Sequence, residues 1–224
     1  MKEMIFRNRE HAGQLLAGAL SKYANRKDVI VLGLPRGGVP VAYEVAKALN
    51  APLDVIVVRK LGVPGWEELA MGAIASGGVR VINEQVVRSS DISADLIEQA
   101  VATQLEELHR REMTYRGHTG APEVQGKTII LVDDGIATGA TIRAAVSALR
   151  QQNPARIVIA VPTAAADSCM MLEPLVDELV TLLKPMYFRA VGQWYEDFSQ
   201  TSDAEVKWLL TRAGSQSPAE FAPN

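Results

Sequence analysis

The sequence is poor in the residues that build disulfide scaffolds and metal clusters. Its 224 residues include one cysteine, Cys169, and three histidines, His11, His109 and His118, which lie far apart. A single cysteine excludes an internal disulfide framework and a cysteine-based metal cluster. The spacing of the histidines argues against a histidine metal site. A reduced, cytoplasmic setting is therefore the expectation.

Long apolar runs and a strong excess of one charge are also missing. The longest apolar runs, such as 128–132 and 157–161, have the length of a strand, well short of the roughly 20 residues that a membrane-spanning helix needs. Residues 1–7 carry charges where a signal peptide has an apolar segment. The formal net charge is −3, whereas nucleic-acid-binding domains are usually strongly basic. We therefore expect neither a membrane nor a nucleic acid as partner.

Aliphatic residues are abundant, and their pattern alternates between strand and helix. The chain is 48% hydrophobic but only 5% aromatic, which is typical of buried parallel strands. Apolar runs predict strands at 28–33, 53–58, 127–133, 156–161 and 178–183, with shorter strands at 69–75 and 79–82. Helical spacing predicts helices at 10–23, 40–49, 93–115, 140–151 and 164–176. This order predicts an α/β fold with a mainly parallel sheet and helices on both faces. We expect one domain over 1–212 and a flexible tail over 213–224.

Parallel sheets of this kind bind ligands beyond the carboxyl ends of their strands, and the segment after Val132 has unusual chemistry there. Two acids, Asp133 and Asp134, follow the apolar strand directly. A run of small and hydroxyl residues then leads into a helix: Gly135, Ala137, Thr138, Gly139, Ala140 and Thr141. Such a loop presents backbone N–H groups and a helix N-terminus to an anion. The pattern favours a ligand with a phosphate and a ribose diol, although an ordinary strand-to-helix turn uses the same residue types.

The strand, the acidic pair and the Gly-x-Ala-Thr-Gly-x-Thr segment together resemble the signature of type I phosphoribosyltransferases. The resemblance implies a Rossmann-related fold that binds phosphoribosyl pyrophosphate. It implies that Asp133 and Asp134 contact the ribose hydroxyls. It also implies that Gly135 and residues 137–141 bind the 5-phosphate.

A second loop, 33–40, places an arginine between a proline and two glycines. Glycine permits close approach of a ligand, and the arginine guanidinium can bind an anion with a planar pair of donors. A surface arginine in a glycine turn would look the same. In the resembled family, the loop at this place binds pyrophosphate, which implies that role for Pro35, Arg36, Gly37 and Gly38.

A third loop is expected after Val58, and it begins with Arg59 and Lys60. Two adjacent cations at a strand end would complement a pyrophosphate, although a solvated charge pair is the alternative. The dipeptide resembles that of adenine phosphoribosyltransferases, which implies a catalytic role for both residues and a mobile lid over 61–68. Loop 117–126 is the other candidate for the lid. The long helix at 93–116 departs from that subfamily and is extra material with no assigned role.

Aromatic residues crowd into 187–198, and that segment includes Trp194, Tyr195 and Phe198. Aromatic rings can stack on a planar base, and a variable hood covers the acceptor in the resembled family. We therefore predict a hood over 187–212, with these three rings facing the acceptor. The alternative is that they dock into the core.

The whole chain resembles a bacterial group described only as predicted phosphoribosyltransferases. The resemblance implies an enzyme that transfers the ribose 5-phosphate group of phosphoribosyl pyrophosphate to a nitrogenous base or similar acceptor and releases pyrophosphate. Mg²⁺ is expected to bind through substrate phosphates and water, without dedicated protein ligands. Members of the family are often dimeric, so a homodimer is a further expectation. The acceptor is not identified. A non-catalytic sensor of the same ligand, and a hydrolase or phosphotransferase, remain alternatives.

Overall fold

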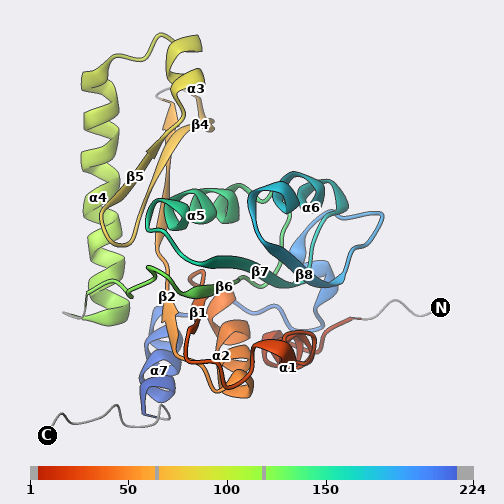
Figure 1. Ribbon diagram of the computed structural model, residues 1–224. Helices are drawn as coiled ribbons and strands as arrows, with labels where there is room; N and C mark the ends of the chain where they lie inside the picture. Colours follow the sequence, from red (N-terminus) through yellow and green to blue (C-terminus); the bar gives the residue numbers. More distant parts are fainter. Residues whose placement is uncertain (1–4, 64–65, 118–119, 216–224) are drawn as a thin grey trace, which may run out of the picture.

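A five-stranded parallel sheet forms the centre of the computed structural model, which describes residues 5–63, 66–117 and 120–215 (Figure 1). Its strand order is β2–β1–β6–β7–β8. The strands are β1 (Val29–Gly33), β2 (Leu53–Val55), β6 (Thr128–Val132), β7 (Arg156–Thr163) and β8 (Glu178–Leu183). The predicted mainly parallel α/β sheet is confirmed.

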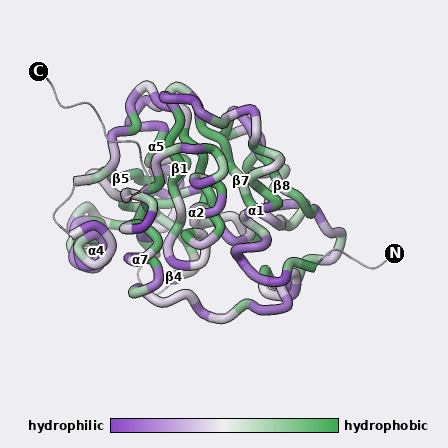
Figure 2. Tube along the Cα trace, turned by 90° about the horizontal axis from the view of Figure 1, so that it is seen from below, coloured by the Kyte–Doolittle hydropathy of each residue, from purple (hydrophilic) through white to green (hydrophobic). Residues whose placement is uncertain are grey.

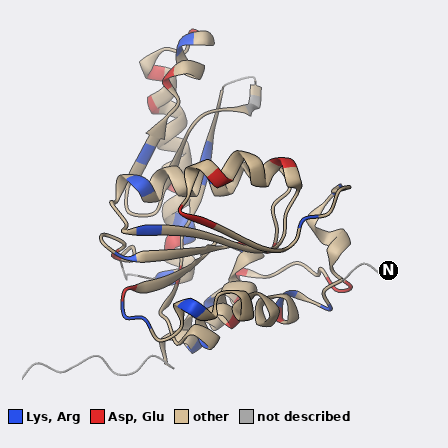
Figure 3. Cartoon of the chain, turned by 45° about the vertical axis from the view of Figure 1, so that its right-hand side comes forward, with Lys and Arg blue, Asp and Glu red and all other residues tan. Residues whose placement is uncertain are grey.

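Helices cover both faces of this sheet because alternate strand residues point to opposite sides. Helices α1 (Arg9–Ala19) and α2 (Gly38–Leu49) pack on the face that carries Ile130 and Val132 of β6. Helices α5 (Ala140–Gln151) and α6 (Ala166–Leu172) pack on the face that carries Ile129 and Leu131. All five residues of β6 are buried. Figure 2 shows the apolar strands enclosed by more polar helices, and Figure 3 shows few charged residues on the central strands.

A second sheet stands beside the first. The predicted strands at 69–75 and 79–82 are confirmed as parts of it, but their separation from the parallel sheet was not predicted. It contains β3 (Val58–Val63), β4 (Trp66–Ala75) and β5 (Val79–Ile82), paired antiparallel in the order β3–β4–β5. Helices α3 (Glu84–Ser89) and α4 (Ala94–Arg116) continue this excursion on one side of the molecule (Figure 1). Apolar residues of α4, including Val101 and Leu108, pack with Leu61 and Met71 of the two long strands.

The predicted strand 53–58 is therefore wrong as a single element. The chain leaves the parallel sheet after Val55 and enters the antiparallel sheet at Val58. Ser76 fixes this change of direction, because the Val57 N–H donates to Ser76 Oγ (3.0 Å) while the Ser76 N–H donates to the Val57 carbonyl oxygen (2.9 Å). The predicted loop after Val58 is accordingly strand β3 and the start of β4.

The remaining elements complete the covering layers. Helix α7 (Asp203–Gly214) packs on α2 and α4, and its Val206 and Leu209 are buried in the cluster shared with the antiparallel sheet. Three short 3₁₀ helices lie at Ser21–Tyr23, Glu173–Leu175 and Val191–Trp194. None of the helices in the described ranges is long and apolar enough to cross a membrane.

Several predicted boundaries shift in the structure. The helix predicted at 164–176 is the shorter α6 followed by the 3₁₀ turn at Glu173–Leu175, where Pro174 interrupts α-helical hydrogen bonding. The predicted flexible tail begins too early, because α7 extends to Gly214. Residues 216–224 of that tail, the tip 64–65 of the first predicted lid and residues 118–119 of the second lie outside the described residues.

The ion pair of Arg116 joins α4 to the central sheet. Its side chain is only 4% exposed, and its Nε donates to Asp54 of β2 (2.8 Å) while Nη1 contacts Glu112 (3.2 Å). A buried charge that loses its partner is strongly destabilising. We expect Arg116→Ala to lower the free energy of unfolding by about 3 kcal/mol, measured by urea denaturation.

The matched control is Arg88→Ala, which removes an i,i+4 ion pair with Glu84 on the surface of α3, where the Arg88 side chain is 79% exposed. This variant should stay within about 0.5 kcal/mol of the wild type. Equal losses for the two variants would show that Arg116 does not anchor α4.

Candidate functional site

Two loops predicted to bind ligand lie side by side at the carboxyl edge of the parallel sheet. Gly33 of β1 pairs with Val132 of β6, so the two strands end in register. The Leu34 N–H donates to the Val132 carbonyl oxygen (2.9 Å), which holds the start of one loop against the end of the neighbouring strand. The residues predicted from two separate motifs therefore form one site.

Glycine allows these loops to touch. A Cβ atom on Gly38 would lie 2.7 Å from the Val132 carbonyl oxygen and 2.8 Å from Asp133 Cα, and one on Gly37 would overlap the Asp134 carboxylate. These neighbouring atoms belong to the backbone or to the short side chain of Asp134, so they cannot move aside to make room for a Cβ atom. Gly37 and Gly38 are thus required for the loop to pack on the acidic pair, whatever they also do for a ligand.

Asp134 is held by an arginine that the sequence motifs did not reveal. Arg9, the first residue of α1, contacts the Asp134 Oδ2 atom through Nε (2.9 Å) and Nη2 (2.8 Å). The two side chains are 11% and 14% exposed. Arg9 Nη1 also donates to the Ser199 carbonyl oxygen (2.6 Å), and its guanidinium lies over the Phe198 ring at 3.9 Å. One arginine therefore joins the start of α1, the acidic loop and the segment before α7.

The two acids have different surroundings. Burial raises the pKa of Asp133 well above its usual range, and the neighbouring charge of Asp134 raises it further. Burial also raises the pKa of Asp134, but the Arg9 charge and hydrogen bonds oppose this rise. Asp133 Oδ1 accepts the Asp134 backbone N–H (2.9 Å), which orients its carboxylate. Arg9 therefore favours the ionised form of Asp134 more strongly than that of Asp133.

The segment after the acids leads into an open helix N-terminus. Gly135 is buried, because a Cβ there would lie 2.6 Å from Val191 Cγ1. Gly139 has φ +71° and directly precedes α5, a conformation that favours glycine. The exposed residues of this segment are Ala137, Thr138, Ala140 and Thr141. Backbone N–H groups at the first turn of α5 therefore face solvent, in an arrangement that suits an anion.

This segment is braced from beneath by the neighbouring strand and helix. Ile136 forms a parallel bridge with Ala164, and the Ser168 hydroxyl of α6 donates to the Ala137 carbonyl oxygen (2.5 Å). Binding groups that are fixed by a surrounding shell of contacts are more precise than those on a free loop. The position of this segment therefore depends on Ser168 of α6, a residue that lies outside the sequence motif.

Arg36 lies at the edge of the other loop, where the Pro35–Arg36 peptide bond is cis. Its side chain is 38% exposed, and Nη1 lies 4.0 Å from Asp203 Oδ1 at the start of α7. That separation exceeds hydrogen-bond distance. The guanidinium is therefore near an acid without being tightly bound to it, and it can turn to another anion.

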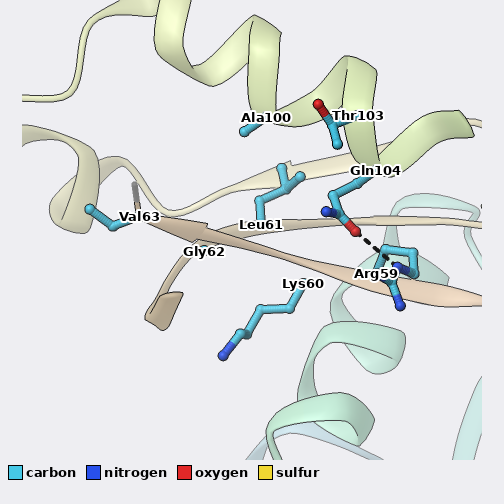
Figure 4. Close-up of a pocket in the computed structure, with 8 residues that line it drawn as sticks. All are labelled: Arg59, Lys60, Leu61, Gly62, Val63, Ala100, Thr103 and Gln104. Carbon is cyan, nitrogen blue, oxygen red and sulfur yellow. Dashed lines mark hydrogen bonds between the residues drawn. The ribbon is translucent and has the colours of Figure 1, made fainter. Parts of the chain in front are cut away.

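The two cations that were predicted to act together lie on a strand, and both line the same cavity. Arg59 and Lys60 lie in strand β3, so their side chains point to opposite faces of the antiparallel sheet (Figure 4). Arg59 faces α4 and donates from Nε to Gln104 Oε1 (2.9 Å). It lines a cavity of about 390 Å³ between β3 and α4. The prediction that both cations sit on a loop is wrong, because the segment is strand β3, whereas their predicted catalytic role stays a prediction.

Two of the three rings assigned to the acceptor hood are part of the core. Trp194 and Tyr195 are 5% and 6% exposed and belong to a buried cluster with Phe6 and Ala12. The Tyr195 hydroxyl donates to the Asp134 carbonyl oxygen (2.6 Å), so this ring supports the acidic loop from behind. A buried ring offers no face to a base, so these two residues are corrected to packing residues. Phe198, which contacts Arg9 and Tyr195, is 36% exposed.

Comparison with known proteins shows the family of the chain. Residues 2–191 match the family model of the phosphoribosyl transferase domain. The chain belongs to the phosphoribosyltransferase family. The match spans both glycine-containing loops, the acidic pair and the central sheet.

The chain is similar to three known proteins. A Mycobacterium tuberculosis (strain H37Rv) protein provisionally named a phosphoribosyl transferase is 48% identical over 93% of this chain and 47% of its own length. The bifunctional protein PyrR of Chloroflexus aurantiacus is 32% identical over 56% of this chain and 65% of its own. The crystal structure of TT1426 from Thermus thermophilus has a TM-score of 0.85 and 42% identity, covering 93% of this chain and 99% of that one. This phosphoribosyltransferase-family chain spans about half the length of the mycobacterial relative.

The phosphoribosyltransferase motifs led to the loop residues but not to the groups that hold them. Arg9, Ser168, Tyr195 and Asp203 contact the two loops from distant parts of the chain. Arg9 and Asp134 are 125 residues apart in sequence. Of these four residues, Tyr195 alone lies in a segment that the sequence singled out, the aromatic cluster at 187–198. Its aromatic ring is buried in the core.

The raised pKa of Asp133 predicts that this carboxyl group, which we expect to bind ligand, lowers the stability of the fold. A carboxyl whose pKa is higher in the folded state than in the unfolded state destabilises the fold once pH exceeds that folded value, and has no such effect below the unfolded value. We therefore expect Asp133→Asn to raise the melting temperature at pH 8. The gain should shrink as pH falls toward 4. Thermal denaturation across this pH range measures both.

Asn keeps the Oδ1 atom that accepts the Asp134 N–H, so the substitution mainly removes charge. The control is Asp197→Asn, because hydrogen bonds from Ser199 lower the pKa of that exposed carboxyl. It should lose stability at pH 8 and approach the wild type at low pH. A loss of stability in Asp133→Asn at pH 8 would contradict the assigned burial cost.

Proposed function

We propose that this protein transfers the ribose 5-phosphate group of phosphoribosyl pyrophosphate to a nitrogenous base or a similar acceptor, with release of pyrophosphate. The observation that supports this most directly is the position of the acidic pair. Asp133 and Asp134 lie between the open N-terminus of α5 and the glycine loop that carries Arg36. The site therefore presents backbone N–H groups, then two carboxylates, then an arginine. A sugar that carries an anionic group at each end fits this order.

Each part of the site would act on a different part of that ligand. The carboxylates of Asp133 and Asp134 would accept hydrogen bonds from the ribose hydroxyls. The N–H groups of residues 137–141 would bind the 5-phosphate. Arg36, with backbone groups of Gly37 and Gly38, would bind the pyrophosphate as negative charge builds on it. Catalysis would then rest on orientation and on stabilisation of the leaving group.

Mg²⁺ suits this ligand, since it is commonly held by substrate phosphates with few protein carboxylates. The described residues contain no group of three His, Cys, Asp or Glu that could bind a metal ion by themselves. When bound to the pyrophosphate, the metal would neutralise part of its charge. The protein's share would be the acidic pair near the ribose and the arginines near the pyrophosphate.

Turnover separates a transferase from a sensor that uses the same site. The protein is incubated with phosphoribosyl pyrophosphate, Mg²⁺ and a panel of purine and pyrimidine bases, and released pyrophosphate is measured. We expect release that depends on one class of base. The double variant Asp133→Asn, Asp134→Asn should bind phosphoribosyl pyrophosphate more weakly by about 1–3 kcal/mol per lost charge-assisted hydrogen bond.

Binding of phosphoribosyl pyrophosphate without release in the presence of any base would favour the sensor. Unchanged affinity in the double variant would show that the ribose lies elsewhere. Asp134→Asn also removes the acid partner of Arg9, so the single variant Asp133→Asn, which is expected to stabilise the fold, is measured beside the double variant. A loss of binding in that single variant cannot be attributed to unfolding.

Arg36 provides a separate test of the orientation of the ligand. We expect Arg36→Ala to weaken binding of phosphoribosyl pyrophosphate about tenfold or more, as for a lost hydrogen bond to a charged group. Binding of ribose 5-phosphate, which lacks the pyrophosphate, should change little. Isothermal titration calorimetry with both ligands measures the difference, and equal losses would contradict the assignment of Arg36 to the pyrophosphate.

A further inference from the structure

Helix α4, which had no assigned role, turns one face toward Arg59 and toward Asp203, the neighbour of Arg36. Gln104, Leu108, Arg111 and Tyr115 repeat every three or four residues and therefore lie on one stripe of the helix. Leu108 and Tyr115 are buried, so this stripe faces the body of the protein. At 1.5 Å per residue, Arg111 lies about 10 Å along the axis from Gln104 and about 6 Å from Tyr115.

One end of this stripe lies near Arg59, and the other end contacts Asp203, which is close to Arg36. Gln104 accepts the hydrogen bond from Arg59 Nε (2.9 Å). The Tyr115 hydroxyl donates to Asp203 Oδ1 (2.7 Å), the same oxygen that lies 4.0 Å from Arg36 Nη1. Arg111 stands on the helix between these contacts. Its position brings a third guanidinium to the region between Arg36 and Arg59.

The electrostatic environment agrees with that placement. Burial lowers the pKa of Arg59, and the charge of Arg111 is the next cause. Burial and the bond to Asp203 raise the pKa of Tyr115 to about 12, while the charges of Arg111 and Arg36 oppose the rise. The charge of Arg110 also acts on Arg59, so these shifts place this part of α4 near Arg59, and the stripe distinguishes Arg111 from Arg110.

The acids Glu107 and Asp203 act on these cations, but Glu107 is shared between Arg110 and Arg111. Among the described side chains, no carboxylate forms an ion pair with Arg59, although that guanidinium is partly buried. Arg111 uses Nε to bind Glu107 Oε1 (2.7 Å), and its terminal Nη atoms have no acceptor within the described ranges. A partly buried cation without an acid partner costs stability, which an anionic ligand would offset.

We propose that Arg111 of α4, together with Arg59 of β3, completes the pyrophosphate-binding site opposite Arg36. The proposal rests on the proposed function. It adds a binding residue from the inserted helix and assigns the pyrophosphate to the face of β3 that carries Arg59, opposite the face that carries Lys60. Planar guanidinium groups that donate two parallel hydrogen bonds suit phosphate oxygens.

The chain contains a matched control one residue away. Arg110 also binds Glu107, through Nε (2.7 Å) and Nη2 (3.0 Å), but its side chain is 60% exposed against 33% for Arg111. One residue turns the helix by about 100°, so Arg110 lies off the stripe. Arg110→Gln and Arg111→Gln remove the same charge and the same kind of ion pair from the same helix.

The experiment measures the affinity of the full chain for three probes in the presence of Mg²⁺: phosphoribosyl pyrophosphate, inorganic pyrophosphate and ribose 5-phosphate. We expect Arg111→Gln to raise the Kd of the first two about tenfold or more and to leave the third within about twofold. Arg110→Gln should leave all three near the wild type. Arg111→Lys should recover part of the lost affinity, because it restores the charge without the planar donors.

Three results would count against the proposal, and they are distinguishable. Equal affinities in the two Gln variants would show that Arg111 does not touch the anion. A similar loss for all three probes in Arg111→Gln alone would indicate a general distortion, which a fall in melting temperature would accompany. If the wild-type protein binds neither phosphoribosyl pyrophosphate nor pyrophosphate, the proposed function itself fails and this inference fails with it.

Discussion

The contact between Arg9 and Asp134 is the interaction on which the geometry of the site depends. Asp134 lies at the edge of the parallel sheet, where its charge is nearly enclosed. Arg9 provides the opposite charge, and its position in turn fixes the start of α1, the Ser199 carbonyl and the Phe198 ring. On the other side, Gly37 leaves room for the same carboxylate. Four segments of the chain are therefore positioned by one buried ion pair.

This arrangement keeps two adjacent carboxyl groups in a place that the core alone would not favour. Asp133 has the larger pKa rise, and no arginine contacts its carboxylate among the described residues. Asp133 therefore costs the fold stability where it stands, as groups at functional sites often do.

The parts of this fold that were predictable from sequence are those encoded by neighbouring residues. The apolar run of β6, the acidic pair and the small residues before α5 are contiguous, so their order in space follows their order in sequence. The run 53–58 is apolar apart from Asp54, and hydropathy does not show that the chain changes sheets between Val55 and Val58. That change depends on Ser76, which lies 19 residues away from Val57.

Contacts over long separations account for the other differences. The sequence does not show that the side chains of Arg59 and Lys60 point to opposite faces, because the glycines nearby suggest a loop. Pairing with β4 makes this segment an extended strand. Trp194 and Tyr195 carry polar atoms that suit either a ligand or a core. Only the position of Phe6, which packs against Tyr195 with ring centroids 5.4 Å apart, decides between them.

The same long separations set the order in which the site can form during synthesis. Loop 34–37 and the acidic pair leave the ribosome well before Ser199 and Asp203 exist. Until then, Arg9 lacks its acceptor at Ser199 and Arg36 lacks its neighbour at the start of α7. The parallel sheet can therefore assemble strand by strand as the chain emerges, whereas the complete ligand-binding geometry is reached only when the last helix closes on α2 and α4.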